Sequence, residues 1–309
     1  MVPHARARPA AGHRATLPAV TARSEVPSSF RSSSVRPGPL ALIRLGITET
    51  LSRRRLIAYL VRADLKKHGA DTLLGNIWWV IDPLLQMLIY WLLVGVILQR
   101  GGAGEDFPLF IFAAILPWKW FDSTIRGGIS AVVGQERLIK QIYFPKMVLP
   151  IAGSMSGVVN FAFGLIPLAA LMLLIYPSRI SVWLVLIPVI AAVQLLFTMG
   201  FAIFVSAVNV FYRDVGNLAR HVLRFWFYLS PALYGVDQVK SIAGDYQIVG
   251  LWFQLNPWTY LFSAYRDVIY EGRPPEWLGL LAITAGSIVL LAFAIWFFKR
   301  VEPSFAKVL

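Results

Sequence analysis

The stretch QERLIKQIYFPK, residues 135–146, decides how this chain is organised. It separates two apolar runs, residues 108–133 and 147–175, and each is longer than the ~20 residues that a membrane-spanning helix needs. Charged side chains are costly in hydrocarbon, so the chain must reach a membrane face at the charged residues of this stretch, Glu136, Arg137, Lys140 and Lys146.

The spacing within the stretch predicts a short amphipathic helix that ends at Pro145. Its apolar residues recur at helical intervals on the side opposite Glu136, Arg137 and Lys140, and they are Leu138, Ile139, Ile142 and Tyr143. Two interpretations remain open from spacing alone. The helix is either a solvated loop helix or a contact point for a soluble partner that acts on the membrane part.

The composition is that of a membrane protein. Of the 309 residues, 57% are hydrophobic, and the mean hydropathy is +0.64. A backbone in lipid must satisfy its own hydrogen bonds, so the apolar runs predict helices. We expect an all-α polytopic membrane protein with six transmembrane helices, at about residues 77–98, 108–133, 147–175, 182–210, 215–235 and 277–298.

The net charge of +13 does not indicate nucleic-acid binding, because the basic residues lie in the N-terminal tail and at the ends of the apolar runs. Lys and Arg are concentrated before the first predicted span, between the second and third, between the fourth and fifth, and after the sixth. The positive-inside rule places these segments, and both termini, in the cytoplasm.

The N-terminal region has two predicted parts. Residues 1–44 are rich in Pro, Ser and Arg with Glu25 as the only acid, which predicts a disordered basic cytoplasmic tail. An organelle transit peptide and a misassigned start codon are alternatives. From Thr48 to His68 an apolar stripe lies opposite basic residues, which predicts an amphipathic interface helix in the headgroup plane of an anionic leaflet.

The long segment between the fifth and sixth predicted spans is not polar enough for a plain loop. Asn256 followed by Pro257 predicts a helix start, and Gly272 predicts its end. We expect short extracytoplasmic helices here, lying in or dipping into the outer leaflet, with Arg266 and Asp267 keeping them near water.

Few charged side chains fall within the predicted spans, and they are candidates for a translocation path. Lys119, Asp122 and Arg126 share one face of the second span. Either Asp122 neutralises a neighbouring cation and the trio fixes packing, or the excess positive charge meets an anionic cargo. Asp82, before Pro83, is either a helix cap or part of the path.

Aromatic side chains extend this candidate path. The run 225–228 holds four consecutive rings, so at least one must face the protein interior, where flat rings stack on sugars. The aromatic members of the predicted path are Trp79, Phe225, Trp226 and Tyr228.

The sequence has no motif for chemistry of its own. It has no G-x-x-x-x-G-K-[ST] phosphate loop, its four histidines lack metal-ligand spacing, and it has no cysteine. We therefore expect no catalytic residue, no metal site and no bound cofactor. An ion channel or carrier would need charges paired across a repeat, and a membrane transferase would need clustered acids or histidines at one face; neither pattern is present.

An ordered set of motifs resembles the ABC-2 type permeases of polysaccharide exporters. The set covers residues 45–309, which we take as one ABC-2 type transmembrane domain. Its members are Thr72-Leu73-Leu74-Gly75 with Trp78 and Pro83, Leu116-Pro117-Trp118, Leu138 to Pro150, Asn209 to Asp214, Leu229-Ser230-Pro231 and Leu255-Asn256-Pro257.

The resemblance implies a half-transporter that forms a homodimer in the bacterial inner membrane and works with two separate ABC-type subunits that bind ATP and Mg. The cargo implied is a lipid-linked glycan such as O-antigen; teichoic acid, capsular polysaccharide or, beyond polysaccharides, a lipid or drug are alternatives. In that family the helix between spans two and three couples to the ATPase. The matching coupling residues are Glu136, Arg137, Ile139, Lys140, Tyr143, Phe144, Arg213 and Asp214.

Overall fold

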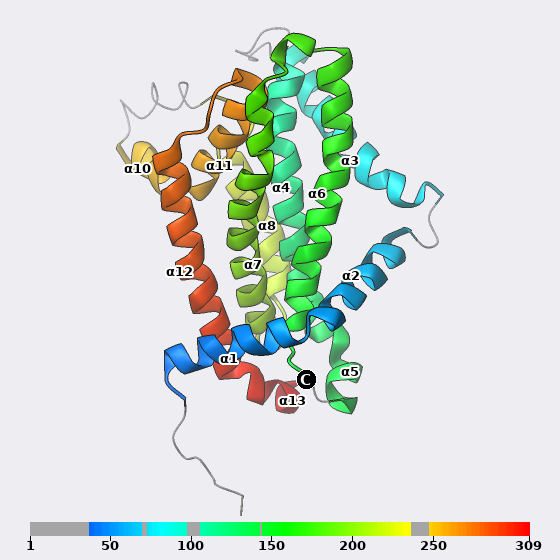
Figure 1. Cartoon of the computed structure of the whole chain (residues 1–309), viewed down its shortest axis with the longest axis vertical. Helices are drawn as coiled ribbons and strands as arrows, with labels where there is room; N and C mark the ends of the chain where they lie inside the picture. Colours follow the sequence, from blue (N-terminus) through cyan, green and yellow to red (C-terminus); the bar gives the residue numbers. More distant parts are fainter. Residues whose placement is uncertain (1–36, 70–72, 98–105, 143, 236–246) are drawn as a thin grey trace, which may run out of the picture. The chain divides into compact units, whose positions relative to one another are not determined.

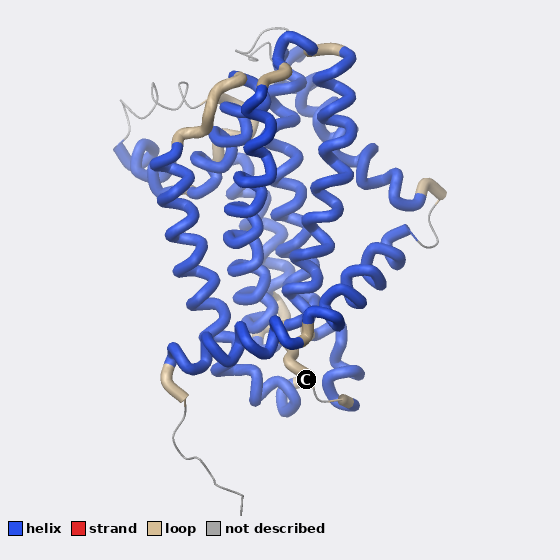
Figure 2. The backbone as a smooth tube through the Cα atoms, viewed as in Figure 1, coloured by secondary structure: helices blue, strands red, loops and turns tan. Residues whose placement is uncertain are grey.

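The computed structural model describes residues 37–69, 73–97, 106–142, 144–235 and 247–309. The chain divides into Met1–Pro37 and Gly38–Leu309, and nearly all of the first unit lies outside the described residues. Throughout the described ranges the regular structure is helical, with no strand (Figure 2). The predicted all-α class is confirmed.

Four long helices lie side by side in the second unit (Figure 1). They are α4 (Phe107–Ala131), α6 (Val148–Leu174), α7 (Ile187–Phe211) and α12 (Trp277–Val301). Helix α4 packs against both α6 and α7, and α7 packs against α12. Most residues of α4 are therefore buried, and its rings Trp118 and Phe121 belong to the main hydrophobic core.

Among the described residues, four helices are long and apolar enough to cross a membrane, with mean hydropathies from 2.0 to 2.5. They agree with the predicted spans at 77–98, 147–175, 182–210 and 277–298, and they are Trp78–Ile97, Val148–Leu174, Val182–Phe211 and Trp277–Val308. The chain is therefore a multi-pass membrane protein.

The other two predicted spans differ from this pattern, so the count of six is not confirmed. Helix α4 has 25 residues, but Lys119, Asp122 and Arg126 make it less apolar than the four candidate spans. Its neighbours bury it, so it does not need the apolar surface of a lipid-facing helix. Helix α8 (Val215–Tyr228) has 14 residues, about 21 Å in length, which is too short to cross ~30 Å of hydrocarbon alone.

The predicted interface helix over 48–68 is two helices, α1 (Pro39–Ser52) and α2 (Arg54–Gly69), separated at Arg53. Helix α1 includes the last residues of the predicted tail, and the tail up to residue 36 lies outside the described part. The apolar side of α2 packs inward through Leu56, Ile57 and Leu60, as the stripe predicts. Beyond α2, a short turn Gly75–Ile77 leads to α3 (Trp78–Tyr90), which continues as a π-helix over Trp91–Ile97.

The second half of the segment after α8, residues 257–270, is more deeply buried than the sequence predicts. It forms α10 (Gln247–Leu255), α11 (Pro257–Arg266) and a π-helix over Asp267–Glu271. The predicted ends hold: the Asn256 side chain accepts the Trp258 backbone N–H, and Gly272 has a left-handed φ of 65°. The predicted surface position does not hold for α11, because Trp258, Leu261, Phe262 and Tyr265 are almost inaccessible.

Short helices gather at the end of the bundle where α1 lies (Figure 1). These are a short 3-10 helix over Val133–Gln135, α5 (Glu136–Gln141), a 3-10 helix over Glu302–Ser304 and α13 (Phe305–Val308). At the opposite end, 3-10 helices Pro177–Arg179 and Val182–Leu186 join α6 to α7. The Arg179 guanidinium donates to Asp106 there, 2.5 Å from Oδ2, and the hydrogen bond raises the pKa of Arg179.

Close packing of α4 on α7 depends on a glycine. A Cβ at Gly128 would lie 3.2 Å from the backbone Cα of Ala202, whereas a Cβ at the adjacent Gly127 would meet nothing within 4 Å. We expect Gly128→Leu to push the helices apart and destabilise the fold by about 1–3 kcal/mol, as overpacking does. Thermal unfolding of purified protein in detergent measures this. The control, Gly127→Leu, should unfold close to the parent temperature, and equal unfolding of the two variants would contradict the packing argument.

Candidate functional site

The helix at the predicted coupling site is short. Helix α5 has six residues and ends at Gln141, because Ile142 adopts an extended conformation with φ −132° and ψ 145°. The sequence predicts a helix that continues to Pro145, so this boundary is wrong by several residues. A helix is not expected to continue into Pro145 in any case, because the residue before a proline, here Phe144, disfavours helical geometry.

Helix α5 is held by ionic contacts on its outer side. Lys140 Nζ lies 2.7 Å from Glu136 Oε1 and donates to the backbone carbonyl of Leu309 at 2.8 Å. The hydrogen bond from Lys140 lowers the pKa of Glu136, and the positive charge of Arg213 lowers it further. The end of the chain and the turn between α7 and α8 therefore lie beside α5.

The predicted coupling residues fall into two groups. Ile139 and Phe144 are buried in the second hydrophobic cluster, so they position the segment from inside. Glu136 is half-buried, and the predicted residues exposed on the surface are Arg137, Lys140, Arg213 and Asp214. Tyr143 lies outside the described residues. The amphipathic pattern predicted one apolar side correctly, but Ile142 lies on the exposed surface.

A buried charge cluster that the sequence analysis missed supports the chain just after α5. Glu302 accepts the backbone N–H of Lys146 at 2.7 Å and the ammonium of Lys299 at 2.7 Å. Lys299 also pairs with Glu49 of α1. The start of α6 is thus tied to α12 and α1. Lys299 and Glu302 are three residues apart, but nothing in their spacing indicates the contact with Lys146.

The charged residues of α4 form two separate ion pairs. Lys119 pairs with Asp82 of α3, and Arg126 pairs with Asp122 one turn away through two hydrogen bonds of 2.8 Å. The predicted excess of one positive charge is therefore wrong, because Asp82 neutralises Lys119. Asp82 lies inside α3, whose N-cap is Ile77, so it does not cap that helix.

The structure brings together some members of the predicted path. Trp79, Asp82 and Lys119 line one small cavity of about 80 Å³. Phe225 and Tyr228 are exposed on α8, and the Tyr228 hydroxyl lies 3.4 Å from that of Tyr90 on α3. The prediction that a ring of this run faces inward is confirmed by Phe227, which is buried.

Trp226, another predicted path residue, belongs to a packing junction. Its indole N–H donates to Asn256 Oδ1 at 3.0 Å, and Asn256 Nδ2 donates to Ser230 Oγ at 2.8 Å. Nearby, Gln194 Nε2 donates to the Pro117 carbonyl at 2.8 Å. The motifs around residues 117, 230 and 256 therefore contain groups that join helices.

Arg266 is the most unusual buried charge in the described residues. Its guanidinium donates to the carbonyls of Pro231 and Ala232 at 2.5 Å and lies 3.7 Å over the Phe110 ring. No acidic side chain of the described chain forms an ion pair with it, and burial lowers the pKa of Arg266 to about 9. The expectation that Arg266 keeps its segment near water is wrong: a carbonyl cage replaces the water.

These features define a multi-pass membrane transport protein. The described residues hold no cluster of metal-binding side chains, and the charged residues of α4 are held in ion pairs. The chain belongs to the ABC-2 type transporter family, whose model matches residues 55–270. It is a transport subunit, not an enzyme, and a permease of this family implies an ABC-type ATPase as partner.

The chain is similar to proteins named O-antigen export system permease protein RfbA. It is 33% identical over 266 residues to that of Myxococcus xanthus, covering 86% of this chain and 99% of the relative. It is 27% identical over 257 residues to one from Klebsiella pneumoniae, covering 82% of this chain and 95% of the relative.

The Arg266 cage generates a stability prediction. Arg266→Met removes the donors and leaves two buried carbonyls without partners, so we expect a loss of roughly 3 kcal/mol. The thermal midpoint of purified protein measures it. Arg220→Met, at an exposed arginine on α8, is the control and should unfold like the parent. A parent-like midpoint for Arg266→Met would show that the cage is dispensable.

The Lys119–Asp82 pair generates a second prediction. Asp82→Asn leaves the Lys119 ammonium without its carboxylate, so the amount of membrane-inserted, folded protein should fall. Adding Lys119→Gln removes the uncompensated charge and should restore most of that amount. Quantitative immunoblotting of membranes and size-exclusion profiles measure both. If the double variant is no better than Asp82→Asn, the two residues do not act as a pair.

Proposed function

We propose that the chain is the transmembrane subunit of an ABC exporter that moves a lipid-linked, O-antigen-like polysaccharide across the bacterial inner membrane. The observation that carries this proposal is the similarity over nearly the whole length of a permease named for O-antigen export. ATP and Mg bind to a separate ATPase subunit, because this chain has no phosphate-binding loop.

A six-span arrangement is part of the proposal. Gly216 at the start of α8 lies beside Ile129 of α4, and Arg266 joins Ala232 to the carbonyl of Phe110 near the other end of α4. From Phe110 to Ile129 the helix rises roughly 28 Å, which is close to the hydrocarbon thickness. Helix α8 and the turns that follow it together supply the fifth crossing, with α4 as the second.

The homodimer is also part of the proposal. Helix α8 exposes an apolar stripe at helical spacing, made of Leu218, Val222, Phe225 and Leu229. Helix α3 buries little of its surface within the chain, and the Asp82 side chain of the Lys119 pair is 61% exposed. An ion pair that faces lipid is costly. We therefore place a second copy of the chain against this face of α3 and α8, with the polar path between the two copies.

The orientation follows from the same reasoning. The end that carries α5, α1 and the C-terminal Leu309 holds the basic residues that the positive-inside rule assigns to the cytoplasm. We place the coupling surface there, on Arg137, Ile142 and the Arg213-Asp214 turn. A soluble ATPase can reach these side chains because they are exposed.

Deletion of the gene that encodes this chain in its bacterium tests the proposed function. Lipid-linked glycan should accumulate on the cytoplasmic side, and none should appear outside until the chain is restored together with an active ATPase. The mass of the purified complex should correspond to two permease chains and two ATPase chains. Normal surface glycan without the chain contradicts the assigned cargo, and a single permease chain in the complex contradicts the homodimer.

The coupling surface gives a separate prediction. Ile142→Asp places a charge on the exposed apolar contact, so the ATPase should copurify in much smaller amounts and export should fall, while the permease remains inserted. Ile248→Asp changes an even more exposed isoleucine on α10 and serves as the control. Full ATPase recovery with Ile142→Asp would place the contact elsewhere.

A further inference from the structure

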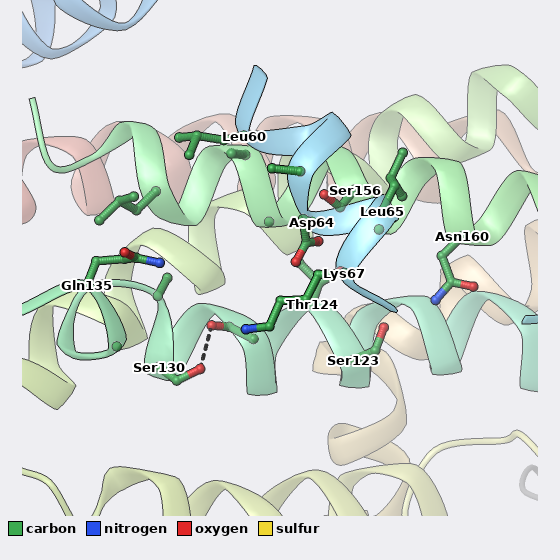
Figure 3. A pocket seen from close by; sticks show the side chains of 18 of the residues that line it. Leu60, Asp64, Leu65, Lys67, Ser123, Thr124, Ser130, Gln135, Ser156 and Asn160 are labelled. Carbon is green, nitrogen blue, oxygen red and sulfur yellow. Dashed lines mark hydrogen bonds between the residues drawn. The ribbon is translucent and has the colours of Figure 1, made fainter. Parts of the chain in front are cut away.

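A cavity of about 540 Å³ lies between α2, α3, α4 and α6, apart from the predicted coupling surface (Figure 3). It reaches from Gln135, just before α5, to Asn160 in the middle of α6. Glycines, hydroxyl groups and amides form much of its wall. Cavities of this size hold small-molecule ligands or lipid headgroups.

Two hydroxyl groups on the wall need a partner. Thr124 and Ser156 are 5% and 6% exposed, and neither hydroxyl has a hydrogen-bond partner among the described residues. Other helix hydroxyls in this region bond back to their own helix: Ser123 donates to the Trp120 carbonyl and Ser130 donates to that of Gly127. Buried polar groups are rarely left unsatisfied, so these two indicate a polar occupant.

The charged side chains on the cavity wall indicate which kind of ligand it binds. Lys67 of α2 lines the cavity, and it forms no ion pair or hydrogen bond with the described residues. An ammonium together with hydroxyl donors suits a phosphate group. Asp64 lies on the same wall, so a single phosphate beside a neutral or cationic group fits better than a densely anionic ligand.

The position of the cavity indicates where such a group comes from. Helix α2 has the basic and apolar sides of a helix that lies at the headgroup level of an anionic leaflet, with Arg62 and Lys66 exposed. This helix forms one wall of the cavity. We propose that it is a binding site for the phosphate-bearing headgroup of a membrane phospholipid, with Lys67 contacting the phosphate and the Thr124 and Ser156 side chains rotating to donate to its oxygens.

The proposal goes beyond the export function, and its test measures binding without transport. The chain has no cysteine, so Ser130→Cys places a single thiol on the cavity wall. Purified full-length protein in dodecyl maltoside is labelled with a water-soluble maleimide. Dihexanoyl phosphatidylethanolamine or phosphatidylglycerol should slow labelling at least about 10-fold, and adding Lys67→Gln should remove most of this protection.

Two further probes identify the source of the phosphate. Octyl glucoside, a sugar amphiphile without phosphate, and farnesyl diphosphate, a prenyl diphosphate, should protect less than the phospholipids. Equal protection by octyl glucoside would overturn the phosphate assignment. Stronger protection by farnesyl diphosphate would overturn the phospholipid assignment and would identify a prenyl diphosphate carrier as the ligand of the cavity. Protection that survives Lys67→Gln would overturn the role of Lys67.

A cavity-filling variant tests the site without a cysteine. A Cβ at Gly153 meets nothing within 4 Å and this glycine lines the cavity, so we use Gly153→Leu to occupy part of the cavity. Gly286→Leu adds the same side chain in equally open space on α12. After matched delipidation, Gly153→Leu should retain about one phospholipid fewer per chain by phosphorus assay than Gly286→Leu. Equal retention by the two folded variants would overturn the proposal.

Discussion

The cost of charge in hydrocarbon is the constraint on which this structure depends. Helix α4 carries Lys119, Asp122 and Arg126 along a length that would otherwise cross a membrane. Each cation is neutralised by one carboxylate, and neighbouring helices cover most of the remaining surface. The less apolar α4 is thus stable in the middle of the bundle, while the more apolar α3 lies outside with little of its surface buried.

The same constraint acts on Arg266. Its guanidinium is satisfied by backbone carbonyls and the face of an aromatic ring, not by an acidic side chain. This contact joins the turn after α8 to α11 and to the start of α4. Because α8 is short, its connection to the far end of the bundle depends on such contacts. The buried Arg266 therefore holds in place the turn that follows the short helix α8.

At the opposite end, the connection from α4 to α6 is braced from several directions. Ile139 and Phe144 anchor it to the core, Glu302 holds the backbone at Lys146, and the last residue of the chain contacts Lys140. A force applied to the exposed side of α5 would reach α4, α6 and α12 together. The proposed coupling surface thus lies on a segment fixed to the bundle, as transmission of a stroke requires.

The sequence alone determined the helical class, four of the spans and the break at residues 135–146. It also determined the cap of α11 at Asn256 and the end of the following π-helix at Gly272. Each of these depends on local composition or on a residue's own conformational preference. Only the tertiary structure decided that Asp82 neutralises Lys119, that α11 and Arg266 are buried, and that Glu302 supports the start of α6. These pairings join residues far apart in the chain, and no periodicity reports which helix covers which. The length of α8 could not be predicted from the sequence either, because the apolar run continues past Tyr228, where the helix ends. Just after that end, the Ser230 hydroxyl donates to the Trp226 carbonyl and Arg266 donates to the Pro231 carbonyl.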